Sequence, residues 1–143
     1  MLVLFDTDIT LDIILEREPF VKDAQKLWKL HENNTITAYI SPITPINVFY
    51  IVRKQRDIEI ARTAVHILLQ SLPLCTIRGT TLFQAYHSSF SDFEDATQHA
   101  VAVESGLDAI ITRNPSDYKN ATLPVYTPVQ ILEKLQSDDG EKV

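Results

Sequence analysis

Leu2-Val3-Leu4-Phe5-Asp6-Thr7-Asp8-Ile9-Thr10-Leu11-Asp12 opens the chain with a short apolar run that leads directly into three aspartates. Such a run, bounded by polar residues, is typical of a buried parallel strand. Ligands of parallel sheets gather at the carboxyl ends of the strands, so we expect Asp6 at the edge where chemistry usually occurs. A carboxylate there is partly desolvated, which is costly unless a cation or hydrogen bonds compensate. We expect Asp8 or Thr7 to cap the following helix, which leaves Asp6 without a structural role.

Short apolar runs alternate with longer amphipathic segments along the chain. This alternation predicts an α/β fold in which helices cover a parallel sheet. The expected strands are 2–5, 36–40, 74–77, 109–112 and 124–126. The expected helices are 9–16, 21–32, 43–55, 58–71, 80–88, 93–105 and 128–136. One side of the helix at 58–71 is apolar and is expected to face the core: Ile60, Ala64, Ile67, Leu68 and Ser71.

The length of 143 residues fits one domain. We expect it to span 1–136, with a frayed polar tail at 137–143. No apolar stretch approaches the roughly 20 residues that cross a bilayer, and no signal peptide opens the chain, so we expect a soluble cytoplasmic protein. The single cysteine, Cys75, lies in an apolar run and is expected to be buried, which suits a reducing compartment. The net charge of −6 argues against broad, non-specific attraction to nucleic acid, although a local binding site remains compatible with it.

Two further groups of polar residues are candidates for the edge that Asp6 occupies. Asp92 and Asp95 fall on one side of a helix start, where Asp92 is the obvious cap and Asp95 is harder to explain as structural. The strand at 109–112 leads into the polar stretch 113–118, which is also good turn chemistry. Three separated segments are therefore expected to direct oxygen atoms to one place.

Together these segments resemble the PIN domain, the metal-dependent nuclease fold of VapC-type toxins and related RNA-processing enzymes. The matching stretches are Val3–Asp12, Ile40–Thr44, Asp92–Ala96 and Ile111–Tyr118. The resemblance implies a three-layer α/β/α fold with a five-stranded parallel sheet. It also implies an acidic pocket that holds Mg²⁺ or Mn²⁺ and cuts RNA. An antitoxin protein is implied as a partner by the toxin branch of the family.

The resemblance also assigns roles to the candidate residues. Asp6, Asp95 and Asp117 are the expected catalytic metal ligands, with Asp117 or Asn114 holding a metal-bound water. Thr112 is expected to hydrogen-bond the acids. The full set of supporting residues is Asp8, Asn47, Asp92, Thr112 and Asn114. Clustered carboxylates are hard oxygen ligands suited to Mg²⁺ or Mn²⁺, and their mutual repulsion favours a bound cation.

The sequence departs from the family pattern at two acidic positions. Asn47 stands where a Glu ligand is common, and Asn114 stands where an acid usually follows the Thr-Arg pair. Each exchange removes one negative charge and is expected to weaken metal binding, although an Asn can still offer a carbonyl oxygen. Asp8 stands where the family often has Asn and restores some of that charge. Asp12, one turn beyond Asp8, is expected to face solvent.

Other functions fit parts of the same pattern. With two acids exchanged for Asn, the domain could bind RNA or a protein without cutting. The opening Asp6–Thr10 also fits the first motif of haloacid-dehalogenase-type phosphatases, in which the first Asp is a nucleophile, but the late acid pair of those enzymes is missing after Ile111. The apolar helices between Pro42 and Leu72 are a candidate homodimer surface.

Overall fold

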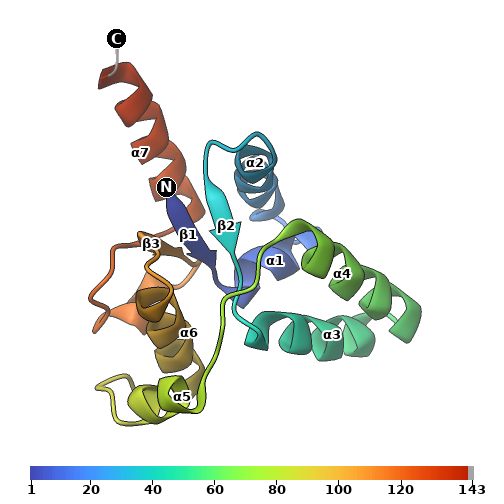
Figure 1. The fold of residues 1–143 in the computed structure, drawn as a ribbon. Helices are drawn as coiled ribbons and strands as arrows, with labels where there is room; N and C mark the ends of the chain where they lie inside the picture. The colour runs from blue at the N-terminus through green and yellow to red at the C-terminus, as the bar shows by residue number, and fades with distance from the viewer. Residues whose placement is uncertain (142–143) are drawn as a thin grey trace.

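The computed structural model describes residues 1–141 and has strands separated by one or more helices (Figure 1). The strands are β1 (Leu2–Phe5), β2 (Thr37–Tyr39), β3 (Ala109–Ile111) and β4 (Val125–Tyr126). The helices are α1 (Thr7–Ile14), α2 (Val21–Glu32), α3 (Ile43–Gln55), α4 (Ile58–Ser71), α5 (Gly79–Tyr86), α6 (Phe93–Glu104) and α7 (Pro128–Glu141), with a 3₁₀ helix, η1 (Pro115–Tyr118), between β3 and β4. Within residues 1–141, every helix is too short or too polar to cross a bilayer.

The four strands form one parallel sheet in the order β2-β1-β3-β4. Phe5 at the end of β1 pairs with Ile111 at the end of β3. The residues that follow these two strands therefore emerge at the same edge of the sheet. Both central strands are almost entirely buried, which explains why their sequences are apolar throughout and do not alternate with polar residues.

The prediction of a fifth strand at 74–77 is wrong. Only Leu74 pairs with the sheet, through an isolated parallel bridge to Ile40. The Ile40 N–H donates to the Pro73 carbonyl at 3.1 Å, and the Cys75 N–H donates to the Ile40 carbonyl at 2.9 Å. The pairing stops because the chain after Ile40 turns into α3 and Pro42 has no N–H to donate. A short apolar run was present, but its partner strand ended beside it.

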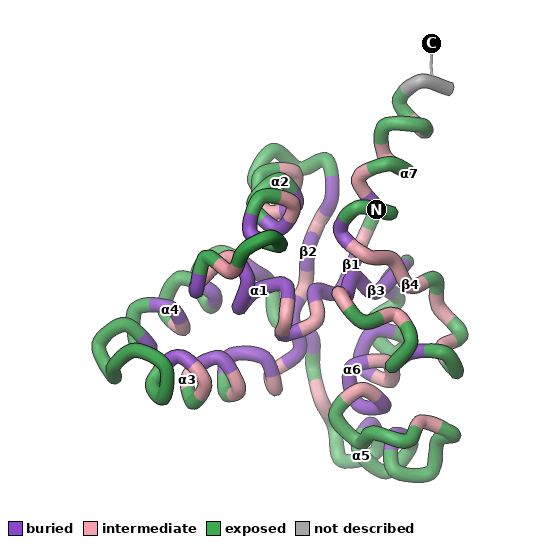
Figure 2. Tube along the Cα trace, turned by 180° about the vertical axis from the view of Figure 1, so that it is seen from behind, coloured by how far each residue is buried: buried purple, intermediate pink, exposed green. Residues whose placement is uncertain are grey.

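Alternate side chains of the strands face two separate cores. Val3, Phe5 and Ile111 pack on one side of the sheet with residues of α1, α2, α3, α4 and α7. Leu4 and Ile110 pack on the other side, mainly with α6. Figure 2 shows the buried segments concentrated in the strands and along the inner sides of these helices. The fold is thus an α/β fold with helices on both faces of a parallel sheet, as predicted.

Of the two predicted helix caps, the one for α6 is confirmed. Asp92 caps α6 by accepting the Asp95 N–H at 2.9 Å, and Gly106 follows the helix with a φ of 69° that suits glycine. The predicted cap of α1 at Asp8 or Thr7 is wrong, because the helix already begins at Thr7 and its cap is Asp6. The same aspartate therefore ends a strand and starts a helix.

One flank of α4 is less buried than its apolar pattern predicts. Ala64 and Leu68 are buried, whereas Ile60 and Ile67 are 44% and 47% exposed. Ile60 and Ile67 line an apolar groove of about 530 Å³ with Trp28 of α2 and residues of α1. The prediction that this whole side of α4 is core is therefore wrong. An amphipathic pattern shows which residues are apolar, but not whether a neighbouring element covers them.

The C-terminal segment is helical further than predicted. Residues 137–141 form the last part of α7, where a frayed polar tail was expected. Lys142 and Val143, which belong to the same predicted tail, lie outside the described residues. The domain division at residue 136 stays a prediction.

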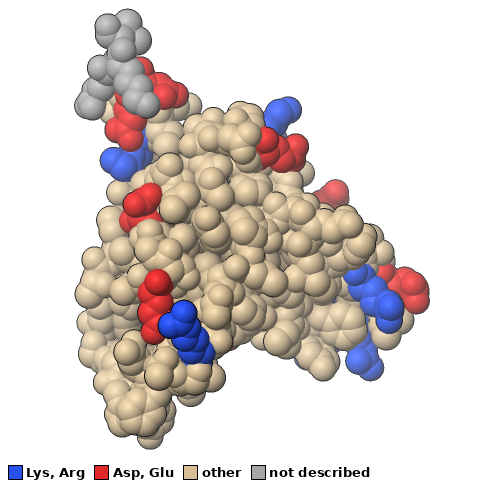
Figure 3. Space-filling view, viewed as in Figure 1, with Lys and Arg blue, Asp and Glu red and all other residues tan. Residues whose placement is uncertain are grey.

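Charged side chains are sparse on the face of the molecule shown in Figure 3. Lys and Arg side chains lie singly or in small groups, one of them beside acidic side chains in the lower part of the view, and no broad basic surface covers this face.

Candidate active site

Asp6 lies where β1 ends and α1 begins, beside the end of β3. Its N–H donates to the Ile111 carbonyl at 3.0 Å. Its carboxylate accepts three hydrogen bonds: from the Thr7 N–H to Oδ1 at 2.7 Å, from the Thr112 hydroxyl to Oδ2 at 2.9 Å, and from the Tyr118 hydroxyl to Oδ2 at 3.3 Å. The structure thus places Thr112 next to the first acid, where the sequence predicts it.

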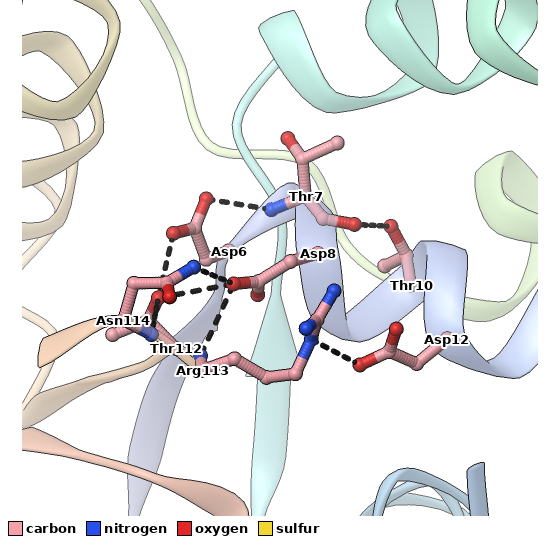
Figure 4. Close-up of polar contacts among 8 residues, drawn as sticks. All are labelled: Asp6, Thr7, Asp8, Thr10, Asp12, Thr112, Arg113 and Asn114. Carbon is pink, nitrogen blue, oxygen red and sulfur yellow. Dashed lines mark hydrogen bonds and ion pairs between the residues drawn. The ribbon is translucent and has the colours of Figure 1, made fainter. Parts of the chain in front are cut away.

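Asp8 is held by the segment that follows β3 (Figure 4). Its Oδ2 accepts the Arg113 N–H at 3.1 Å and the Asn114 side-chain amide at 3.3 Å, and the Thr112 hydroxyl is also 3.3 Å away. A hydroxyl has one hydrogen and Thr112 lies closer to Asp6, so Asp8 depends mainly on the two N–H donors. Oδ1 of Asp8 is buried without a hydrogen-bond partner among the described residues.

The start of α6 brings a second group of acids toward Asp6. Asp95 is half-buried in the first turn, behind its cap Asp92. Glu94, which is not among the predicted site residues, accepts a hydrogen bond from the Asn47 side-chain amide of α3 at 2.8 Å. Its position next to Asp95 is the one sequence feature that could have drawn attention to it. Asn47 is therefore a donor to an acid in this structure.

Four carboxyl groups of the site have raised pKa values, with burial as the main cause in each. Burial and the charge of Asp6 raise the pKa of Asp8 to about 7. Burial and the charges of nearby acids, Asp6 among them, raise the pKa of Asp95 to about 7. Burial also raises the pKa of Asp6, despite its three hydrogen bonds, and burial and nearby charges raise that of Glu94. The local hydrogen bonds thus do not compensate for the negative charge gathered here.

Asp117 and Asn114 lie after β3 and are both exposed. The charge of Asp117 contributes to raising the pKa of Asp6 and of Asp95, which places it within electrostatic reach of both. Asn114 uses its side-chain amide to donate to Asp8. Its role in the structure is therefore to hold an acid in place.

The donor set fits a hydrated divalent cation better than a tightly enclosed one. Within residues 1–141, no three Asp, Glu, His or Cys side chains converge closely enough to hold a metal ion by themselves. Mg²⁺, however, keeps several waters and is usually bound through one or two carboxylates and substrate phosphates. Asp6 and Asp95 supply hard oxygen atoms in a region of excess negative charge, and Oδ1 of Asp8 has no protein partner among these residues.

Arg113 ties the segment after β3 to α1. Its Nε lies 2.7 Å from Oδ2 of Asp12, and its guanidinium carbon lies 4.0 Å from the centre of the Phe20 ring. Asp12 is fully buried, so the prediction that it faces solvent is wrong. Helical spacing alone could not place Asp12, because the arginine that pairs with it comes from a distant part of the chain.

A sequence profile described as the PIN domain matches residues 2–116. The chain belongs to the PIN domain family. No curated protein sequence matches this PIN domain.

Solved structures of toxin-antitoxin systems have a similar fold. A toxin-antitoxin complex from Klebsiella pneumoniae is similar at 24% identity, with a TM-score of 0.65 over 88% of this chain and 97% of the other. VapBC-1 from nontypeable Haemophilus influenzae is similar at 15% identity, with a TM-score of 0.66 over 90% and 99%. VapC20 from Mycobacterium tuberculosis, a sarcin-ricin loop cleaving toxin, is similar at 16% identity, with a TM-score of 0.63 over 76% and 86%. At these identities the likeness concerns the fold.

The raised pKa values predict that the metal-free PIN domain loses stability as the pH rises. Asp8 and Asp95 hold protons up to about pH 7 in the folded state, above the ordinary aspartate pKa of 3.8. The folded state therefore binds more protons than the unfolded state between about pH 4 and pH 7, and the free energy of unfolding should fall across that range. Thermal melting in EDTA should give a lower Tm at pH 8 than at pH 5. Asp95→Asn should reduce the difference, and an equal or larger difference in that variant would contradict the assignment.

The buried ion pair predicts a large effect of Arg113→Ala. This change leaves the carboxylate of Asp12 buried without its partner, which should cost about 3–5 kcal/mol in free energy of unfolding. Urea denaturation measures the loss. Arg113→Ala combined with Asp12→Ala should be less destabilised than the sum of the two single variants, and simple additivity would show that the pair is not coupled.

Proposed function

We propose that this PIN domain is an endoribonuclease that depends on Mg²⁺ or Mn²⁺. The observation that carries the proposal is the concentration of acids with raised pKa values at the carboxyl edge of the sheet, where the charge of Asp6 acts on Asp95 and the charge of Asp117 acts on both. The PIN family match supports a nuclease, and the description of the Mycobacterium tuberculosis neighbour as cleaving the sarcin-ricin loop supports RNA as the substrate class.

In this proposal Asp6, Asp95 and Asp117 hold the cation. When bound, a divalent cation makes a water more acidic and stabilises negative charge on the attacked phosphate. Thr112 and Tyr118 keep the Asp6 carboxylate in one orientation through their hydroxyl groups. Thr112 also accepts the Asn114 N–H at 3.1 Å, which fixes the loop after β3 against the acids.

A second candidate function is RNA or protein binding without cleavage. It is favoured by the way both asparagines at the family's acidic positions behave: Asn47 donates to Glu94, and Asn114 donates to Asp8. Neither replaces the charge of the missing acid. The alternative of a haloacid-dehalogenase-type phosphatase receives no support from the comparisons, which give the PIN family.

The nuclease proposal predicts that purified protein with Mn²⁺ cleaves some members of a panel of single-stranded and structured RNAs. Asp6→Asn and Asp95→Asn should each lower the cleavage rate on the order of 100-fold or more, because each removes a charged group that is proposed to hold the cation. Denaturing gels measure the rate.

Glu133→Gln, an exposed site on α7, is the control with the same loss of charge and should cleave normally. RNA affinity that persists in EDTA, with no cleavage of any RNA by the wild type in Mn²⁺, would favour the binding module.

We also propose that the groove between α1, α2 and α4 binds a helical segment of a protein partner, such as an antitoxin. Its lining is apolar and includes Ile14, Trp28, Ile60 and Ile67, with Glu59 as the charged residue. Amphipathic helices bind such grooves through apolar side chains spaced by three and four residues. Two of the structural neighbours are described as toxin-antitoxin or VapBC assemblies, which supports a partner of this kind.

Occupation of the groove should change the fluorescence of Trp28, the chain's single tryptophan. A designed amphipathic helical peptide with a basic polar face serves as the probe, because the chain is acidic overall. Binding should shift the emission to shorter wavelength as the indole is desolvated. Ile67→Asp should weaken binding at least about tenfold, since it places a charge in the apolar lining. Leu69→Asp, 49% exposed and outside the lining, is the control, and equal effects of both changes would refute a site in the groove.

The homodimer surface stays a proposal for the helices between Pro42 and Leu72. Ile46 and Tyr50, one turn apart on α3, are 58% and 62% exposed. Large apolar side chains at such spacing are suited to contact a second copy of the chain.

A further inference from the structure

Two contacts, one helical turn apart, join α3 to α6 beside the candidate site. The contact through Gln98 is buried. The Gln98 side-chain amide lies 3.4 Å from the Thr44 hydroxyl, which is 3.0 Å from the hydroxyl of Thr7. The second contact is the 2.8 Å hydrogen bond from the Asn47 side-chain amide to Glu94. Asn47 lies three residues after Thr44, and Glu94 lies four residues before Gln98. The two helices are therefore fixed in register against the start of α1, which follows Asp6 and contains Asp8.

The contact between Asn47 and Glu94 brings a carboxylate of α6 next to the residue of α3 that is an acid in the family pattern. Asn47 stands where the family pattern has a Glu, and its amide holds Oε1 of Glu94. Within residues 1–141, no hydrogen bond engages the other oxygen, Oε2, and Glu94 as a residue is exposed. The charge of Asp6 acts on Glu94, which places this carboxylate within electrostatic reach of the first acid of the site.

We infer that Glu94 supplies the carboxylate that Asn47 lacks, and that Asn47 is the positioning residue that turns Glu94 toward the pocket of Asp6 and Asp95. The inference rests on the proposed metal-dependent function. It assigns the charge lost from α3 to the neighbouring helix, so that the pocket keeps an acid at this point. It concerns the binding of a divalent cation, with Mn²⁺ as the probe.

A purely structural role for the contact predicts a different behaviour. If Glu94 only tied α6 to α3, Glu94→Gln would leave cation affinity unchanged. In the metal-free protein the charges of Asp6 and Asp92 act unfavourably on Glu94. Glu94→Gln should therefore leave the metal-free Tm equal or higher in either case, because the glutamine side chain can still accept the hydrogen bond from Asn47. The affinity for the cation is the measurement that separates the two roles.

The test is isothermal titration of Mn²⁺ into the full chain, with thermal melting in EDTA as the second measurement. Glu94→Gln should weaken Mn²⁺ binding on the order of 10- to 100-fold without lowering the metal-free Tm. Asn47→Ala should weaken it less, since the carboxylate remains but is no longer oriented. The exchange Asn47→Glu with Glu94→Gln should restore affinity toward wild type, because it returns the carboxylate to α3 and lets the new amide on α6 donate to it. Glu133→Gln, with the same loss of charge far from the site, should bind as wild type does.

The failure of this inference is distinguishable from the failure of the proposed function. Wild-type affinity in Glu94→Gln, together with loss of binding in Asp6→Asn, would overturn the role of Glu94 and leave the metal site standing. A lower metal-free Tm with unchanged affinity would show a structural tie and would also overturn it. A wild-type chain that binds no Mn²⁺ would overturn both.

Discussion

The parallel pairing of β1 with β3 is the constraint on which the site depends. It brings the ends of the two strands to one level, so that Asp6 and Thr112 meet although they are 106 positions apart. Thr112 then binds Asp6, and the residues after it hold Asp8. Burial outweighs these hydrogen bonds, because the pKa of Asp6 remains raised even with three donors around its carboxylate. The sheet therefore creates a concentration of charge that its own donors do not offset.

The same edge of the sheet contains acids in two electrostatic situations. Asp12 is buried against Arg113, and this ion pair links α1 to the segment after β3. Asp6, Asp8 and Asp95 have hydroxyl or amide groups as their hydrogen-bonding neighbours, or a capping carboxylate behind them. Burial raises the pKa of Asp12 even though Arg113 lies against it. Acids with raised pKa values that separate elements bring together are typical of functional sites.

Local pattern was enough to predict most of this architecture. The bounds of α2, α3 and α4 agree with the periodicity because each amphipathic segment is delimited by turn or capping residues. The prediction of a fifth strand at 74–77 was wrong because an apolar run forms a strand only where a partner strand with free N–H groups lies beside it. Here the partner strand ends before Pro42. The prediction that the apolar flank of α4 is buried was wrong for a related reason, since no helix of the described chain covers Ile60 and Ile67. Within the site, Asp6, Asp8, Asp95 and Thr112 could be found because they stand at element boundaries. Asp12 could not, because its environment is set by Arg113 from another element, and only the position next to Asp95 pointed to Glu94.

The acidic edge is shared among residues 6–8, 47, 94–95 and 112–118, and this dispersion has a consequence for synthesis of the protein. A nascent chain that has not yet reached Thr112 lacks the hydroxyl and amide donors that hold the first two aspartates. Its acids remain hydrated and apart, as in any unfolded polypeptide. A truncated product released by the ribosome before that point would therefore lack the assembled pocket, and whatever activity the pocket confers would begin only once nearly the whole domain has emerged and folded.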